Sequence, residues 1–131
     1  MKITLDHFKR FNKQIILKKV GVIGQKKILS AKVLVVGAGG LGCPLITYLA
    51  SSGVGKIGIV DFDKVEMSNL NRQTLFGTND IGKFKVDQAK KKINRINKKI
   101  KIIPFKKKLT SKNIKKIFKE FDIICDGTDN F

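Results

Sequence analysis

A glycine-rich turn and a polar segment beyond it carry the residue types that could perform chemistry. The turn reads Gly37-Ala38-Gly39-Gly40-Leu41-Gly42, and the polar segment runs from Asp61 to Gln73. Glycines let the backbone approach phosphate oxygens closely, and the free N–H groups at the start of a helix stabilise their negative charge. The turn therefore predicts a site for a nucleotide or a dinucleotide.

The elements expected around this turn fit that interpretation. The run Lys32–Val36 is rich in β-branched apolar residues, which is typical of a buried parallel strand. A helix is expected to begin near Gly40, because apolar residues recur at helical spacing as far as Leu49, and Gly53 follows where a helix usually stops. Phosphate binding requires this order of strand, glycine turn and helix. A tight turn without a ligand is the alternative.

Asp61 is expected to end the next strand, residues 56–60, with its carboxylate facing the same crevice. In dinucleotide-binding folds, an acid about twenty residues after the glycines accepts hydrogen bonds from ribose hydroxyls. A nicotinamide-dependent oxidoreductase needs only these features and is one hypothesis. It does not explain Ser68, Asn69 and Arg72, which lie outside any apolar periodicity. Their place near a strand end favours contact with a ligand.

Nearly the whole chain resembles the ThiF family, the adenylyltransferases of molybdopterin and thiamine biosynthesis that activate ubiquitin-like sulfur-carrier proteins. The resemblance rests on five motifs in the same order: Arg10–Leu17, Gly37–Gly42, Asp61 with Ser68–Gln73, Gly82–Lys85, and Asp126–Asn130. It implies an ATP-dependent enzyme that forms an acyl adenylate on the C-terminal carboxylate of the carrier. It also implies Mg²⁺ as a cofactor and a homodimer.

The resemblance assigns roles to individual residues. It places Gly40 at the phosphates and Asp61 at the ribose, and it implies that Arg72, Lys85 and Asp129 are catalytic, with Asp129 as the Mg²⁺ ligand. The complete set of nucleotide-binding residues that it implies is Gly37, Gly39, Gly40, Gly42, Asp61, Asp63, Ser68, Asn69, Leu70, Asn71, Arg72, Lys85, Asp129, Asn130 and, from a second subunit, Lys13.

These residue types suit the reaction. A C-terminal carboxylate has an unperturbed pKa of about 3.5, so it is ionised at neutral pH and can attack the α-phosphorus without a general base. The site must instead supply charge neutralisation and alignment. Arg72 can hold phosphate oxygens with a planar fork, Lys85 adds a point charge, and Mg²⁺ on Asp129 offsets charge on the departing pyrophosphate.

Lys13 departs from the family pattern, which has a second arginine in the opening segment. In the family this arginine is thought to reach the active site of the partner subunit. Lys13 keeps the charge but loses the bidentate fork, so weaker alignment is expected. The alternative is that the change from arginine to lysine has no mechanistic meaning, because only three of the 28 basic residues in this chain are arginine.

The formal net charge is +18, which raises the question of nucleic-acid binding. The lysines are spread along the chain in short runs, and the nine Phe and one Tyr form no interleaved stacking platform. A solvated lysine-rich surface is therefore favoured over a nucleic-acid site. Attraction to an acidic protein partner is compatible with such a surface.

Segments that would direct the chain to a membrane or for export are not evident. No apolar run is long enough to span a bilayer, and charges interrupt residues 1–17, so neither a membrane span nor a secretory signal is expected. Cys43 and Cys125 form neither a disulfide framework nor a CxxC zinc site. These features predict a protein of the cytoplasm, or of the plastid stroma if the gene is organellar.

The remaining pattern predicts an α/β fold. A Rossmann-like, doubly wound parallel sheet is expected over residues 31–131, after a helical N-terminal segment of residues 1–30. Further strands are expected at residues 101–105 and 121–126, with Ser111 capping a helix between them. Right-handed crossovers give the strand order 3-2-1-4, in which the glycine turn meets Thr128-Asp129-Asn130.

The resemblance also implies a longer protein. Family members continue for about another domain, so the chain is expected to be truncated after about four strands. The absent C-terminal part is expected to hold a Zn²⁺ site and much of the groove for the carrier. A noncatalytic remnant that binds a nucleotide or partners without turnover is therefore a third hypothesis.

Overall fold

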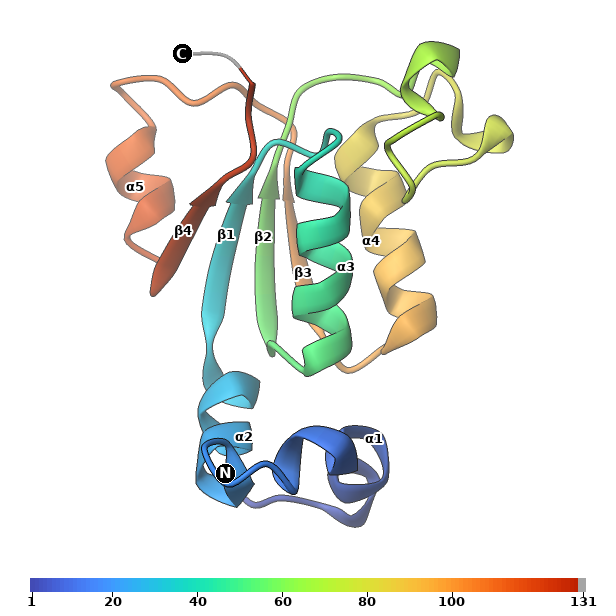
Figure 1. Ribbon diagram of the computed structural model, residues 1–131. Helices are drawn as coiled ribbons and strands as arrows, with labels where there is room; N and C mark the ends of the chain where they lie inside the picture. The colour runs from blue at the N-terminus through green and yellow to red at the C-terminus, as the bar shows by residue number, and fades with distance from the viewer. Residues whose placement is uncertain (130–131) are drawn as a thin grey trace.

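Four parallel strands form one sheet in the computed structural model, which describes residues 1–129. The strands are β1 (Lys32–Val36), β2 (Lys56–Val60), β3 (Lys101–Phe105) and β4 (Ile123–Asp126). Their order is β3-β2-β1-β4, as predicted. Val36 at the end of β1 pairs with Val60 of β2 and with Asp126 of β4. The carboxyl ends of the strands therefore meet at one edge of the sheet (Figure 1).

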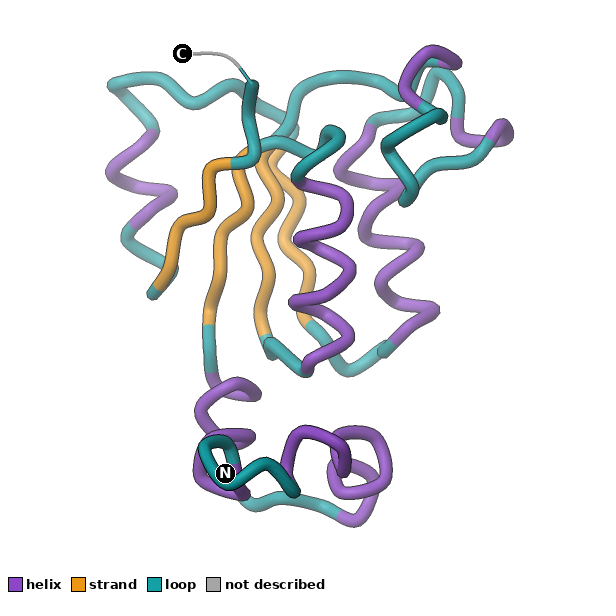
Figure 2. Tube along the Cα trace, in the orientation of Figure 1, coloured by secondary structure: helices purple, strands orange, loops and turns teal. Residues whose placement is uncertain are grey.

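Helices cover both faces of this sheet (Figure 1 and Figure 2). α3 (Gly42–Ser52) and α4 (Lys85–Ile96) pack on one face, and α5 (Ile114–Phe118) packs on the other. Side chains of β1 alternate between them: Val33 and Val35 belong to the core cluster of α3 and α4, whereas Leu34 packs with Ile117. This burial on both faces confirms the doubly wound α/β arrangement. Within residues 1–129, no helix is long and apolar enough to cross a membrane.

α1 (Leu5–Ile15) and α2 (Gly21–Ser30) form the helical N-terminal segment. They lie at the end of the sheet where the strands begin, away from the glycine turn (Figure 1). Nε2 of Gln14 donates to the carbonyl of Ser52 at 3.0 Å, and Nη1 of Arg10 donates to the carbonyl of Ile96 at 3.0 Å. α1 is thus tied to the C-terminal ends of α3 and α4.

Two element boundaries differ from the prediction by about two residues. α3 begins at Gly42 rather than near Gly40, because residues 37–41 are still needed to turn the chain from β1. β4 begins at Ile123 rather than at Phe121. The Phe121 ring is buried in the small core beneath α5 instead of extending the strand.

The predicted cap of α5 is wrong. Ser111 is not the capping residue, because the helix begins at Ile114 and Asn113 directly precedes it. Thr110 and Asn113 form hydrogen bonds with each other instead. The Thr110 N–H donates to Oδ1 of Asn113 at 2.8 Å, and Oγ1 of Thr110 accepts from the Asn113 N–H at 3.3 Å. This reciprocal pair provides the local turn that Ser111 was expected to start.

A long irregular connection joins β2 to α4. It contains two short 3₁₀ helices, η1 (Met67–Asn69) and η2 (Thr78–Asp80). Its two ends pair like a short ladder: the Lys85 N–H donates to the Asp63 carbonyl at 3.1 Å, and the Val65 N–H donates to the Lys83 carbonyl at 2.8 Å. The ladder holds the segment after β2 beside the start of α4.

Candidate nucleotide site

The glycine loop is a tight turn that requires glycine at its closing position. Gly37 has a φ of 94°, and its N–H donates to the Val60 carbonyl at 2.8 Å. A Cβ atom at Gly42 would lie 1.8 Å from the Gly37 carbonyl oxygen. Any larger residue at position 42 would therefore force the loop open. The loop leaves β1 and enters α3 directly, which is the geometry of a phosphate-binding turn.

The segment after β4 packs against this loop. A Cβ atom at Gly127 would lie 3.3 Å from both N and Cα of Gly42. A Cβ atom at Gly37 would lie 3.2 Å from Cγ2 of Thr128. The two predicted motifs therefore do meet at the edge where the strand order reverses, which is where open α/β sheets bind ligands.

Asp61 ties the loop to the chain beyond β2. Its Oδ2 accepts a hydrogen bond from the Ala38 N–H at 2.9 Å, and its Oδ1 accepts one from the Asp63 N–H at 2.8 Å. Each carboxylate oxygen can accept more than one hydrogen bond, so both keep capacity for ribose hydroxyls. Asp61 therefore supports the loop in addition to the role that the sequence predicts.

Arg72 lies directly over the glycine loop. A Cβ atom at Gly40 would be 3.5 Å from Cγ and Cδ of Arg72 and 3.6 Å from its Nε. Nη1 of Arg72 donates to the Ser68 carbonyl and to Oδ1 of Asn71, both at 3.1 Å. These contacts hold an exposed guanidinium beside the turn, where phosphate oxygens would lie.

The neighbours of Arg72 mainly shape this segment. Oδ1 of Asn69 accepts from the Glu66 N–H at 2.9 Å, which closes the turn of η1. Leu70 packs against the main core. Both residues were predicted as nucleotide contacts, and in the structure their contacts anchor the segment that carries Arg72.

Gln73 is a site residue to which sequence reasoning gave no role, although it ends the polar motif. It is only 4% exposed, and its Nε2 would lie 3.7 Å from a Cβ atom at Gly39. Among residues 1–129, its Oε1 has no hydrogen-bond partner. A buried acceptor left unpaired costs about 1–3 kcal/mol. Such an atom beneath the loop marks a place for a donor from a ligand or a water molecule.

Lys85 begins α4 and is 5% exposed. It lies close enough to Cys43 for its charge to act on that thiol. Burial raises the pKa of Cys43, whereas a backbone hydrogen bond from Leu75 and the charge of Lys85 oppose that rise, and Asp61 adds to it. The charges of Lys85 and Asp61 therefore both act on the Cys43 thiol at the start of α3, and their contact with a nucleotide stays a prediction.

The end of the described chain holds the predicted Mg²⁺ ligand. Two hydrogen bonds from Thr128, one from its hydroxyl and one from its N–H, lower the pKa of the Asp126 carboxyl. Asp129 follows as an exposed carboxylate, and Asn130 lies outside the described residues. Within residues 1–129, no three His, Cys, Asp or Glu side chains gather as a metal cluster. One carboxylate together with nucleotide phosphates is an ordinary way to hold Mg²⁺, so Asp129 fits that ion.

Lys13 does not join these residues. It is exposed on α1, at the end of the sheet opposite to the glycine loop (Figure 1). A contribution from Lys13 to this site would therefore have to come from a second copy of the chain.

Comparison with known proteins agrees with this geometry. Residues 11–131 match the model of the ThiF family, so the chain belongs to that family. It is 48% identical over 128 residues to a probable molybdopterin-synthase adenylyltransferase of Porphyra purpurea, covering 98% of this chain and 34% of that protein. It is 47% identical over 125 residues to the adenylyltransferase and sulfurtransferase uba4 of Aspergillus clavatus, covering 95% of this chain and 25% of that protein.

A solved structure shows the same fold with a nucleotide. The E. coli tRNA N6-threonylcarbamoyladenosine dehydratase TcdA, crystallised in complex with ATP, superposes with a TM-score of 0.92 at 25% identity. The match covers 99% of this chain and 53% of that protein. The chain thus spans a quarter to a third of the two curated relatives above and about half of this structure.

Proposed function

We propose that this chain binds ATP with Mg²⁺ and forms the nucleotide-binding part of an adenylyltransferase. Its substrate would be the C-terminal carboxylate of a ubiquitin-like sulfur-carrier protein. The observation that carries the proposal is Arg72 lying over Gly40, because a cation at a glycine turn suits a polyphosphate. Relatives named adenylyltransferases and an ATP-bound structure of the same fold support it.

In the proposed reaction, one bond to the α-phosphorus forms and another breaks. A carboxylate oxygen of the carrier attacks the α-phosphorus of ATP, the bond from that phosphorus to the bridging oxygen breaks, and pyrophosphate leaves. Arg72 and Lys85 would neutralise the charge that builds on the phosphoryl oxygens, and Asp61 would hold the ribose. Mg²⁺ on Asp129 would supply further charge neutralisation at the phosphates. The products are an acyl adenylate and pyrophosphate.

A homodimer is part of the proposal. In it, Lys13 of one copy reaches the nucleotide on the other, because within one chain α1 lies at the far end of the sheet. The carrier belongs to molybdopterin or to thiamine synthesis, and the Porphyra purpurea relative, a probable molybdopterin-synthase adenylyltransferase, favours the former.

Calorimetric titration of the chain with Mg-ATP and with NAD tests the proposal against an oxidoreductase. We expect tighter binding of ATP, dependent on Mg²⁺, because the exposed guanidinium at the loop suits a triphosphate. Arg72→Ala should weaken ATP binding about tenfold, the loss of a charge-assisted contact of roughly 1.4 kcal/mol. Tighter binding of NAD without any effect of Mg²⁺ would refute the proposal.

A further inference from the structure

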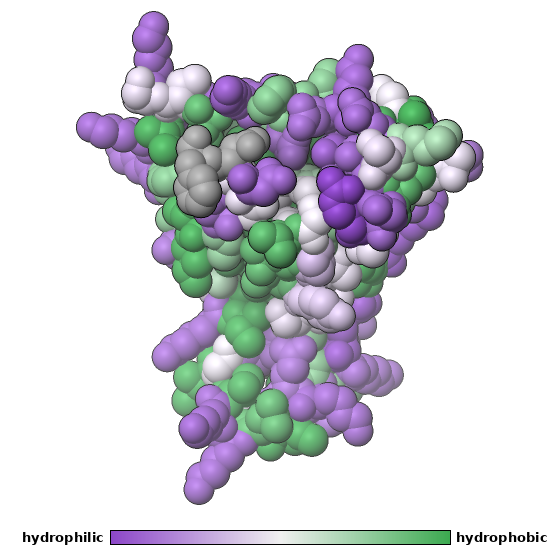
Figure 3. All heavy atoms as spheres, turned by 45° about the horizontal axis from the view of Figure 1, so that its top comes forward, coloured by the Kyte–Doolittle hydropathy of each residue, from purple (hydrophilic) through white to green (hydrophobic). Residues whose placement is uncertain are grey.

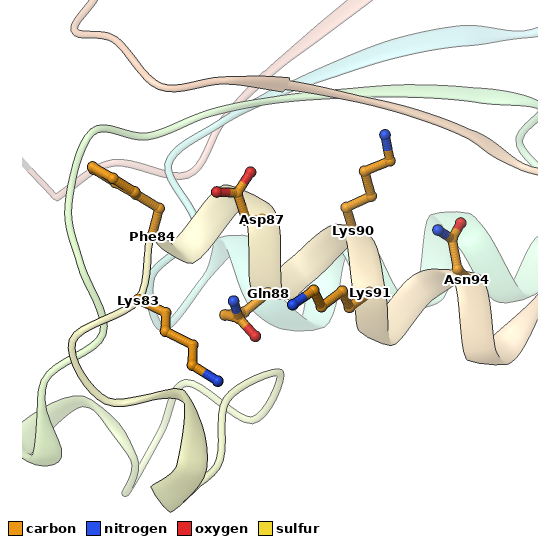
Figure 4. Close-up of a pocket in the computed structure, with 7 residues that line it drawn as sticks. All are labelled: Lys83, Phe84, Asp87, Gln88, Lys90, Lys91 and Asn94. Carbon is orange, nitrogen blue, oxygen red and sulfur yellow. The ribbon is translucent and has the colours of Figure 1, made fainter.

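A groove that the nucleotide site does not use runs along α4. One hollow of about 490 Å³ is lined by Lys83, Gln88, Lys90 and Lys91 among others (Figure 4). A second hollow, of about 430 Å³, lies between α4 and η2 and adds Lys92 and Arg95. The two share Gln88 and Lys91, so they form one surface, called the α4 groove below.

The α4 groove carries an excess of unpaired positive charge. Its lining has five cationic side chains, none of which forms a salt bridge within residues 1–129: Lys83, Lys90, Lys91, Lys92 and Arg95. Its two carboxylates already have partners within the chain. Asp80 accepts from the Gly77 N–H at 2.8 Å, and Asp87 forms a 2.6 Å salt bridge with Lys106. The cations are therefore left to attract an anionic ligand.

Gln88 adds a side-chain amide where the two hollows meet. The residue is 5% exposed, and its amide still reaches solvent, because among residues 1–129 only Oε1 of Gln73 is both buried and without a partner. Figure 4 shows the Gln88 side chain between those of Lys83 and Lys91, with its amide oxygen toward them. A half-turn about the terminal bond of Gln88 brings the two amide donors to that side instead. Gln88 can then donate to an oxyanion beside the ammonium groups of Lys83 and Lys91.

Aromatic contacts distinguish between anionic polymers. Phe84 lines the groove, but its ring is already engaged by two cations: Nζ of Lys64 is 5.1 Å and Nζ of Lys106 is 4.9 Å from the ring centroid. Single-stranded nucleic acids are usually held by bases stacked on free aromatic faces. The groove offers donors for anions and no free platform for bases, which favours carboxylates of a polypeptide.

We propose that the α4 groove binds an acidic segment of a protein partner. Carboxylates of the segment bind Lys83, Lys91 and Arg95, and the Gln88 amide donates to one of them. The site is separate from adenylation, because none of these side chains belongs to the glycine loop or to the Arg72 segment. The α4 groove would then be one defined binding site on a chain whose positive charge is otherwise distributed.

Fluorescence anisotropy with a labelled decaglutamate peptide tests the proposal, at about 150 mM salt to suppress diffuse attraction. The double variant Lys91→Gln/Arg95→Gln should weaken binding about tenfold. The charge-matched control Lys115→Gln/Lys116→Gln changes exposed lysines on α5, on the other face of the sheet, and should weaken it less than about twofold. Equal losses in the two double variants would overturn the proposal.

Two further measurements sharpen the result. Gln88→Leu removes the amide without changing the charge and should weaken peptide binding about threefold, which diffuse attraction alone does not predict. Circular dichroism checks that this variant is folded, and if it is not, the two double variants still decide. A thymidine oligonucleotide of the same charge that binds more tightly than the peptide, and that loses affinity in Lys91→Gln/Arg95→Gln, would reject an acidic protein segment as the ligand.

Discussion

Arg72 shows how a single exposed residue can be held in position for chemistry. Its stem lies against Gly40, and the Ser68 carbonyl and Asn71 Oδ1 accept from the same Nη1. Exposed arginines otherwise lose rotamer freedom on binding an anion. These contacts have already restricted the side chain at the place where it is needed, so part of that loss occurs on folding.

Arg72→Lys tests whether the fork matters beyond its charge. Lysine keeps the cation but cannot bond two phosphate oxygens in a plane. We expect Mg-ATP affinity between those of the native chain and Arg72→Ala, with a loss of about threefold to fivefold. Isothermal titration of the three proteins measures it. Native affinity in Arg72→Lys would show that only a point charge is needed.

The burial of Cys43 predicts that the thiols of Cys43 and Cys125 differ in reactivity. Burial raises its pKa, and it is fully buried, whereas Cys125 is only partly buried. Because the thiolate is the reactive form, iodoacetamide at pH 8 should modify Cys125 in the native chain and spare Cys43. Peptide mass spectrometry reads out both sites. Equal labelling in native and unfolded protein would contradict the assignment.

The same pKa shift predicts a dependence of stability on pH. A thiol whose folded pKa is raised stays protonated in the native state while the unfolded thiol ionises above about pH 8.5. Its contribution to the free energy of unfolding is therefore fully present below that pH and declines as pH rises further. Urea unfolding of the native chain and of Cys43→Ala between pH 7 and 10 isolates this contribution. Identical slopes in the two proteins would count against it.

The glycine loop and the start of α3 act together as one element. Gly42 is the first residue of the helix, and the space for its missing side chain is filled by the Gly37 carbonyl oxygen at 1.8 Å. Neither the loop nor the helix can shift alone, because β1 and α3 are both packed in the core. The phosphate-binding geometry is thus maintained by packing beneath it.

Gly42→Ala should open this loop. Overpacking at a site with no room costs about 1–3 kcal/mol, and the displaced Gly37 carbonyl would reach into the phosphate site. We expect loss of stability by that amount in urea unfolding and no measurable ATP binding. Gly77→Ala is the control, since its φ is −120° and the nearest atom to a new Cβ is 3.9 Å away. A Gly42→Ala chain with native stability and native affinity would disprove the packing argument.

At the scale of the molecule, the N-terminal segment leaves apolar surface uncovered. Leu5, Ile16, Leu17 and Ile23 are each more than half exposed. The lower part of Figure 3 shows hydrophobic residues lying among hydrophilic ones. Exposed apolar residues grouped in this way often mark a protein interface. The proposed homodimer would bury them while bringing Lys13 to a second nucleotide site.

Ile23→Lys tests that arrangement. A charge placed in an apolar interface must be desolvated, so the dimer should weaken by at least about tenfold. Tyr48→Lys is the control, because Tyr48 is 74% exposed on α3 and Ile23 is 73% exposed on α2. Light scattering after size-exclusion chromatography reports the mass. A monomeric native chain, or an equal effect of the two substitutions, would reject this interface.

The amino-acid sequence by itself determined the strands, their order and the meeting of the glycine turn with the segment after β4. These features depend on local patterns: apolar runs, glycines at turns, and crossovers that are right-handed in nearly all proteins. The boundaries at Gly42 and Ile123 differed by about two residues, because turn and strand residues look alike where one gives way to the other.

Only the tertiary structure decided how the irregular connection between β2 and α4 folds. No periodicity predicts that Arg72 covers Gly40, that Gln73 is buried with an unpaired oxygen, or that Lys83 and Lys91 face one groove. Such contacts join residues far apart in the chain, and they are selected by packing against a core that exists only after folding. The sequence supplies the functional groups of this site, and the packed sheet and helices set the distances between them.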